Sequence, residues 1–319
     1  MTALSRRRYG ELIEARLRRP AALRQALLAR RRRELLGPDG RMLIIAADHT
    51  ARGKLAVGGT PLMAADRYTL LDRLVCGLTT PGVDGVLASA DIIEDLAWLG
   101  VLDDRLALGT MNRGGIVGAR WELDDRMTAY DVDGIEAYGL DGGKVLIRLD
   151  DADPAVPRTL ESAAAAVSGL AARSLMAVVE VLACRRDENG KTVLDPSHDR
   201  LVQAVAVGSG LGSSSAHTWL KIPASRRMVE VAGATTLPIL MLGGDPGSAV
   251  GTLFDDWATG LREPNVRGLI PGRTLLYPHD GDVPLVMRRA AVLVHPDSQS
   301  GSTHLHHDSH PDPHPAPEA

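Results

Sequence analysis

The feature that most constrains the fold is a regular alternation, from residue 41 onward, of short apolar runs with longer stretches of helical periodicity. This alternation is typical of parallel strands, because a parallel neighbour is reached only through a crossover connection. The apolar runs lie at residues 42–47, 83–89, 106–111, 144–149, 176–182, 218–222, 238–242 and 266–270. Helices are expected at residues 62–77, 92–99, 159–173, 196–207, 225–232, 248–259 and 283–291. Eight alternating units predict an α/β fold of the closed (β/α)8 TIM-barrel type, which needs about 250 residues.

An open, doubly wound sheet is the main alternative. Its dinucleotide-binding form carries a glycine-rich turn directly after the first strand. Here the first strand is followed by Asp48-His49-Thr50 instead. The barrel is therefore favoured, and no cofactor is predicted.

Three segments are expected: a helical extension at residues 1–40, the barrel domain at 41–295 and a tail at 296–319. The extension carries arginine runs at Arg6–Arg8 and Arg30–Arg33. A phosphate or nucleic-acid patch is one interpretation of these runs, but no aromatic residues are interleaved with them. We therefore expect them to form solvated faces of a helix that continues to residue 36.

The tail is rich in His, Pro, Ser and Asp and poor in apolar residues, so burial cannot offset the entropy lost on ordering. We expect it to be disordered. An irregular cluster of histidines is weak evidence for a specific metal site, and no metal is predicted. The tail histidines are His304, His306, His307, His310 and His314.

Composition argues against several partners and compartments. The formal net charge of -4 gives no general attraction for nucleic acid or for an anionic membrane, and neither is expected as a partner. The N-terminus shows no signal-peptide pattern, and no apolar run reaches transmembrane length. The only cysteines, Cys76 and Cys184, cannot form a disulfide framework or a CxxC site, so a cytoplasmic location is expected.

Charged residues at or near the strand ends indicate where the chemistry lies, because catalytic groups of such barrels project from the carboxyl ends of strands. These residues are Asp48, Arg113, Lys144, Arg148, Glu180 and Lys221. A charge inside an apolar strand is costly to bury unless it is paired. Two lysines and a glutamate on consecutive strands therefore indicate a functional cluster.

Lys221, in the run Trp-Leu-Lys-Ile-Pro, is the sharpest candidate. Apolar neighbours and a second nearby cation both favour the neutral amine that a nucleophile requires. A lysine that extends from the strand end to water is the alternative. Glu180 is a candidate proton shuttle or half of a buried ion pair, and the two interpretations are compatible. Lys144 is either part of this site or an ordinary lysine at a strand entry.

Glycine-containing turns follow the last two strands. Gly243 and Gly244 come after the seventh, and Gly272 and Arg273 come after the eighth. Barrels commonly bind phosphate here, because glycine lets backbone N–H groups approach the anion. A phosphorylated small molecule is the expected partner.

At these residues the chain resembles the class I, Schiff-base aldolase superfamily of deoxyribose-phosphate, archaeal-type fructose-bisphosphate and tagatose-bisphosphate aldolases. The resemblance covers residues 41–293. It implies an aldehyde-lyase in which Lys221 forms the Schiff base, Glu180 moves protons, Asp48 binds substrate hydroxyls and Lys144 favours the neutral amine of Lys221. Barrel aldolases often form oligomers, so a homo-oligomer is compatible with the resemblance.

The resemblance points to a phosphorylated keto sugar or keto sugar acid as substrate. Related bacterial proteins linked with inositol breakdown make 2-deoxy-5-keto-gluconate 6-phosphate a candidate, whose carboxylate Arg113 or Arg148 would receive. Arg148 stands where tagatose-bisphosphate-type relatives often carry an aromatic pair after the strand 4 lysine, so the sugar is left open.

Two other functions remain open at this stage. The first is a metal-dependent barrel lyase with Asp48, His49 and either His217 or His279 as ligands. The second is a sugar-phosphate-binding regulator that keeps the barrel without turnover.

Overall fold

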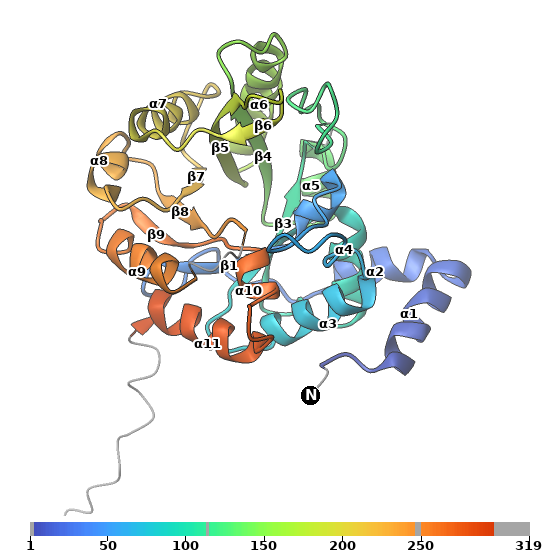
Figure 1. The fold of residues 1–319 in the computed structure, drawn as a ribbon. Helices are drawn as coiled ribbons and strands as arrows, with labels where there is room; N and C mark the ends of the chain where they lie inside the picture. Colours follow the sequence, from blue (N-terminus) through green and yellow to red (C-terminus); the bar gives the residue numbers. More distant parts are fainter. Residues whose placement is uncertain (1–2, 113–114, 246–249, 297–319) are drawn as a thin grey trace, which may run out of the picture.

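The computed structural model describes residues 3–112, 115–245 and 250–296. Eight parallel strands close into a barrel, in which β9 pairs with β1 and β4 pairs with β5. Figure 1 shows the ring of strands surrounded by helices. The strands are β1 (Met42–Ala46), β2 (Gly85–Ala88), β3 (Leu106–Thr110), β4 (Gly142–Leu149), β5 (Met176–Arg186), β7 (Thr218–Pro223), β8 (Ile239–Leu242) and β9 (Val266–Leu269). The predicted TIM barrel is confirmed, with a strand at each of the eight expected runs.

The connecting helices match the seven expected ones to within a few residues. They are α3 (Arg67–Leu78), α4 (Ala90–Trp98), α6 (Val156–Ala171), α7 (His198–Ser209), α8 (Met228–Gly233), α9 (Val250–Gly260) and α11 (Val283–Val294). Two of them begin at side-chain caps, where Asp66 accepts from the backbone N–H of Thr69 and Asp282 accepts from that of Leu285. The structure also contains α5 (Val132–Ala137), α10 (Arg273–Leu276) and the 3-10 turn η1 (Asp48–Arg52), which are too short to show a sequence period.

The strands separate two apolar cores. Side chains that point inward, such as Ile44, Leu108, Val178 and Leu240, fill the barrel interior. Their neighbours in sequence point outward and pack under the helices. Glu180 comes two residues after the inward-pointing Val178 on β5, and Lys221 comes two residues after the inward-pointing Trp219 on β7. Both ionisable groups therefore point into the barrel.

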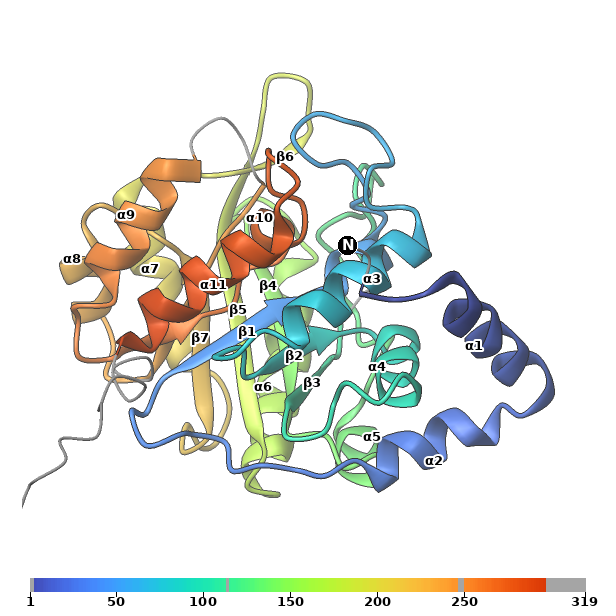
Figure 2. The same ribbon diagram turned by 90° about the horizontal axis from the view of Figure 1, so that it is seen from below.

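The N-terminal segment lies outside the barrel against α3 and α4 (Figure 2). It forms α1 (Arg6–Arg18) and α2 (Ala21–Ala29). Arg16 pairs with Asp95 of α4, and the Arg8 guanidinium stacks on Trp98. These contacts fix the extension to the helical layer.

The second arginine run differs from expectation, because the helix ends at Ala29 and Arg30–Arg33 pass under the amino ends of the strands. Arg30 and Arg32 each lie 2.9 Å from a carboxylate oxygen of Asp141, which precedes β4. Arg33 donates to Asp84, which precedes β2, at 2.6 Å. The predicted helix does not reach these residues, and the prediction of solvated side chains was wrong for the buried Arg30 and the largely buried Arg33, whereas Arg31 and Arg32 are exposed as expected.

β5 extends beyond the barrel and forms a hairpin with β6 (Thr192–Leu194), which pairs with it antiparallel. Cys184 lies opposite Leu194 in this hairpin. In Figure 2 the hairpin projects from the same end of the barrel as the β1–α3 loop. It therefore forms part of the wall around the carboxyl ends of the strands.

The predicted disordered tail from residue 297 onward lies outside the described residues. Within the described ranges, no helix has the length and apolar character needed to cross a membrane.

Candidate active site

Four ionisable side chains form a continuous chain of ion pairs at the carboxyl end of the barrel. The Nζ atom of Lys144 lies 2.8 Å from Oδ2 of Asp48 and 2.7 Å from Oε2 of Glu180. The Nζ atom of Lys221 lies 3.2 Å from Oε1 of Glu180. The structure thus brings together all four residues predicted to be catalytic.

These groups are almost fully removed from water. The side chains of Lys144, Lys221 and Asp48 are 1%, 5% and 7% exposed, and that of Glu180 is 13% exposed. A buried charge persists only where opposite charges and hydrogen bonds compensate it. The alternation of carboxylate and amine supplies that compensation.

Glu180 remains ionised at the centre of this chain. Burial by itself would raise the pKa of its carboxyl, but the charges of Lys144 and Lys221 outweigh burial and lower the pKa to about 2. A carboxylate held between two amines can accept a proton from either of them and return it.

A cavity of about 160 Å³ opens above the four residues. Asp48, Lys144, Glu180 and Lys221 line its floor, and apolar side chains, among them Leu182, Leu194, Leu242 and Ile270, also line it. The β5–β6 hairpin supplies Leu194. The cavity is therefore a polar reaction centre with an adjoining apolar surface.

Basic residues from two loops also line the cavity. Arg52 and Lys54 come from the segment after β1, and Arg273 follows β9. With Lys144 and Lys221 they make five basic side chains against two carboxylates. The excess of positive charge favours an anionic ligand.

His49 lies among these charges and also lines the cavity. Burial lowers its pKa to about 4, and the charges of Arg273, Lys221 and Lys54 act in the same direction against the opposing effect of Asp48. The imidazole is therefore neutral near pH 7.

The glycines predicted to hold a phosphate lie beside Arg273. Gly243, Gly244 and Gly272 all line the cavity. A Cβ atom at Gly272 would lie 2.4 Å from the carbonyl oxygen of Ala46, so this backbone approach requires glycine. The structure thus brings these three glycines and Arg273 to the same cavity as the lysines.

Of the two arginines predicted to receive a substrate carboxylate, Arg148 does not line this cavity. Arg148 donates from Nε to Oδ2 of Asp125 at 2.8 Å, and its NH1 atom lies 3.1 Å from Oε1 of Glu122. It is buried in this pair of contacts and does not line the cavity. Arg113 lies outside the described residues.

Sequence reasoning missed Arg52, Lys54 and Leu194 as cavity residues. Arg52 and Lys54 follow β1, whose end is where barrel sites are built, and this position was the available signal. Leu194 gave no signal, because its position depends on the hairpin with β5.

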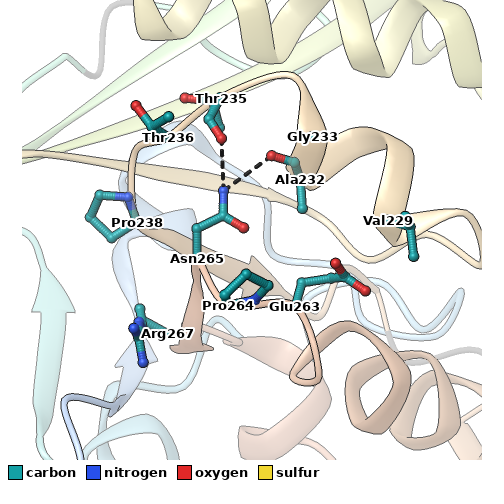
Figure 3. Close-up of a pocket in the computed structure, with 10 residues that line it drawn as sticks. All are labelled: Val229, Ala232, Gly233, Thr235, Thr236, Pro238, Glu263, Pro264, Asn265 and Arg267. Atoms are coloured by element: carbon teal, nitrogen blue, oxygen red, sulfur yellow. Dashed lines mark hydrogen bonds between the residues drawn. The ribbon is translucent and has the colours of Figure 1, made fainter.

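A larger cavity, of about 570 Å³, lies at the opposite end of the strands (Figure 3). The segments before β8 and β9 line it, and Asn265 donates from Nδ2 to the backbone oxygens of Ala232 and Thr235. None of the buried lysines or their carboxylate partners line it. We therefore place the candidate active site in the smaller cavity, where ionisable groups converge.

Within the described ranges, no group of three or more His, Cys, Asp and Glu side chains is arranged to hold a metal ion. His217 and His279, which the metal-dependent alternative would use, do not line the cavity.

Comparison with known proteins identifies relatives at two levels of similarity. The family model described as Cgl0159-like matches residues 40–291. The crystal structure of Cgl0159 from Corynebacterium glutamicum is 45% identical, covers 93% of this chain and 100% of its own, and superposes with a TM-score of 0.89. No curated protein sequence matches the chain.

More distant solved structures share the fold. An archaeal fructose 1,6-bisphosphate aldolase is 18% identical over 86% of this chain and 99% of its own, with a TM-score of 0.59. A fructose-bisphosphate aldolase from Slackia heliotrinireducens is 15% identical over 92% and 94%, with a TM-score of 0.57. At this identity the likeness establishes a common barrel.

Proposed function

The chain belongs to the Cgl0159-like family, and we propose that it is a class I aldolase that cleaves or forms a carbon–carbon bond through a Schiff base on Lys221. The observation that carries the proposal is the contact of one carboxylate, Glu180, with two buried amines. The fold shared with enzymes described as Schiff-base-forming fructose-bisphosphate aldolases supports the same chemistry.

Lys221 is the better placed of the two amines to act as a nucleophile. Lys144 contacts two carboxylates, which hold its positive charge, whereas Lys221 contacts one, at the longest of the three distances.

The steps follow from these positions. The neutral amine of Lys221 attacks the carbonyl carbon of a ketone, and loss of water from the carbinolamine gives an iminium ion. The bond between the carbons α and β to that centre then breaks, and its electron pair moves into the iminium to give an enamine. The β-hydroxyl gives its proton to the Glu180 carboxylate as an aldehyde leaves. Protonation and hydrolysis of the enamine release the second product and the free amine.

Glu180 is the proposed proton carrier, because its carboxylate is within hydrogen-bonding distance of Lys221. It accepts the proton that the amine loses and supplies the proton that leaves with the carbinolamine oxygen as water. Asp48, at the other end of the ion-pair chain, fixes Lys144 and offers an acceptor to substrate hydroxyls.

The proposed substrate class is a phosphorylated keto sugar or keto sugar acid. The excess of basic side chains around the cavity supports an anionic substrate, and Gly243, Gly244, Gly272 and Arg273 are proposed to hold the phosphate. 2-Deoxy-5-keto-gluconate 6-phosphate remains a compound to test within this class.

The proposal is tested by borohydride reduction of the protein mixed with a panel of ketose phosphates and that keto acid, followed by peptide mass spectrometry. A reduced adduct of substrate mass on Lys221 is expected. No adduct with any ketone, or an adduct confined to the exposed Lys191, would overturn the assignment.

A further inference from the structure

Asp245, which follows β8, joins two loops at the mouth of the cavity. Its Oδ2 atom accepts a hydrogen bond from NH1 of Arg273 at 2.7 Å, and its Oδ1 atom accepts one from the backbone N–H of Gly58 at 3.0 Å. The same NH1 atom also donates to the carbonyl oxygen of Ala56 at 3.1 Å. Asp245 thus ties the segment after β1 to the basic residue after β9.

Arg273 has further N–H donors that its contact with Asp245 does not use. Its hydrogen bonds to described residues use NH1 alone, so Nε and NH2 have no partner in the described ranges. The side chain is 7% exposed and lines the cavity. A guanidinium whose remaining N–H groups are available there can receive an oxyanion at two points.

Lys54 is a second cation at the same place. Its side chain makes no ion pair or hydrogen bond with any residue in the described ranges, although it lines the cavity. Its pKa is lowered by desolvation and by the positive charges of Arg273 and Arg52. Three basic residues therefore share this part of the cavity, and Asp245, half exposed at 47%, is the carboxylate that contacts one of them.

We infer that Asp245 is an internal competitor for the substrate's anion, and that a phosphate monoester displaces it from Arg273 and is then held by Arg273 and Lys54. This inference rests on the proposed function, and it narrows the substrate class to compounds with a phosphate dianion at this end of the cavity. Neither Lys54 nor Asp245 was singled out by the sequence.

Competition by a built-in carboxylate sets a threshold for binding. A free carboxylate that replaces Asp245 at Arg273 carries the same single negative charge, and its binding also costs the entropy of association. A phosphate dianion brings a second charge and a third oxygen, which engage Lys54 and the further donors of Arg273. Phosphates therefore bind here and simple carboxylates do not.

The test is calorimetric titration of inorganic phosphate and of acetate at pH 8 into the full-length protein and its variants. Asp245→Asn keeps an oxygen for the N–H of Gly58 but removes the competing charge. It should tighten phosphate binding about 10- to 100-fold, the effect of one charged hydrogen bond, and make acetate binding measurable. Lys54→Met should weaken phosphate binding about tenfold.

Two control variants match these changes in charge. Glu34→Gln removes an exposed carboxylate under the barrel, and Lys191→Met removes an exposed lysine at the β5–β6 turn, and neither lines the cavity. Both should leave phosphate binding unchanged. Weaker or unaltered phosphate binding in Asp245→Asn would overturn the inference, because a residue that merely positions Arg273 would have that effect.

The proposed function is tested separately with the same variants. Borohydride trapping of dihydroxyacetone, a ketone without phosphate, reports on Lys221 without engaging the anion subsite. Adducts in every variant together with unaltered phosphate binding in Asp245→Asn would refute the proposed competition by Asp245 but not the Schiff-base mechanism. Tighter phosphate binding in Asp245→Asn without any adduct would support the competition and refute the Schiff-base mechanism.

Discussion

The Nζ atom of Lys221 lies 3.2 Å from Oε1 of Glu180, so the proposed nucleophile already contacts a base inside the barrel. The other oxygen of that carboxylate contacts Lys144 at 2.7 Å. Loss of any one of these groups leaves a buried charge with fewer partners, and this relationship determines what substitutions should do.

Replacement of the nucleophile should remove activity and leave the fold intact. In Lys221→Met, Glu180 keeps its partner Lys144, and the new side chain is apolar and of similar length. We expect at least about a 10³-fold loss of kcat and no borohydride adduct, as is typical for loss of a covalent nucleophile. Steady-state kinetics and circular dichroism check this, with Lys191→Met as the control. A folded Lys221→Met protein with wild-type turnover would refute the mechanism.

Glu180→Gln should lower both activity and stability. Two buried lysines would then share less negative charge, at a cost of about 3–5 kcal/mol in the free energy of unfolding. Loss of the proton carrier should reduce kcat by about 10²–10⁴-fold. Urea unfolding and kinetics at neutral pH measure the two effects.

The stabilising effect of Glu180 should also depend on pH. Because the pKa of its carboxyl falls to about 2 in the folded protein from an ordinary value of 4.5, its contribution is present above pH 4.5 and is lost as the pH falls toward 2. The difference in unfolding free energy between wild type and Glu180→Gln should therefore shrink from pH 6 to pH 3. A difference that stays constant over this range would contradict the assignment.

The arginines under the barrel provide a matched pair of substitutions. The side chains of Arg30 and Asp141 are 3% and 6% exposed, whereas that of Arg31 is 67% exposed beside Asp104. Arg30→Ala should destabilise the protein by about 3–5 kcal/mol, since it uncovers a buried carboxylate. Arg31→Ala should leave the free energy of unfolding nearly unchanged, because its ion pair is exposed to solvent. Equal midpoints of urea unfolding for the two variants would show that the buried Arg30–Asp141 ion pair does not stabilise the fold.

His295 should stabilise the protein more in mild acid than in base. It lies between Asp84, at 3.0 Å from Nε2, and Asp39, at 2.5 Å from Nδ1. Burial alone would lower its pKa, but these carboxylates raise the pKa above its ordinary value of 6.5. Its contribution is therefore complete below pH 6.5 and is lost as the pH rises through the folded-state pKa.

The matching measurement is thermal unfolding of wild type and His295→Asn at pH 6 and pH 9. The wild type should have the higher Tm at pH 6, and its advantage should be smaller at pH 9. Arg33 also faces Asp84, so part of the carboxylate's neutralisation remains in the variant. An equal advantage at both pH values would show that His295 acts only through packing.

The strands could be predicted because six of the eight contain at least four consecutive buried residues, which appear in the sequence as uninterrupted or nearly uninterrupted apolar runs. Lys144, Glu180 and Lys221 stood out because they interrupt such runs. Arg148 interrupts the same run as Lys144, yet its partners Glu122 and Asp125 lie 26 and 23 residues away on a loop. Sequence shows that a buried charge needs a partner, but not which distant residue supplies it.

The contacts of the arginines under the barrel and of the residues at the cavity mouth could not be predicted from sequence for a related reason. Charged residues in loops and at helix ends are ordinary, so nothing local distinguished Asp245, and neither the place of Lys54 after β1 nor the arginine run around Arg30 showed which residues they contact. Their significance depends on contacts with strand entries and loops far along the chain. Only the closed barrel brings those segments together.

Asp84 is held from both ends of the chain, since Arg33 donates to one of its oxygens and His295 contacts the other. During synthesis the ribosome releases Arg33 and Asp84 early, but His295 only after the last helix. Asp84 therefore gains its second ionic partner only after α11 has been synthesised. The amino end of the barrel is completed at the same point, so a nascent chain that stops before α11 should keep this end unpaired and be exposed to quality-control proteases.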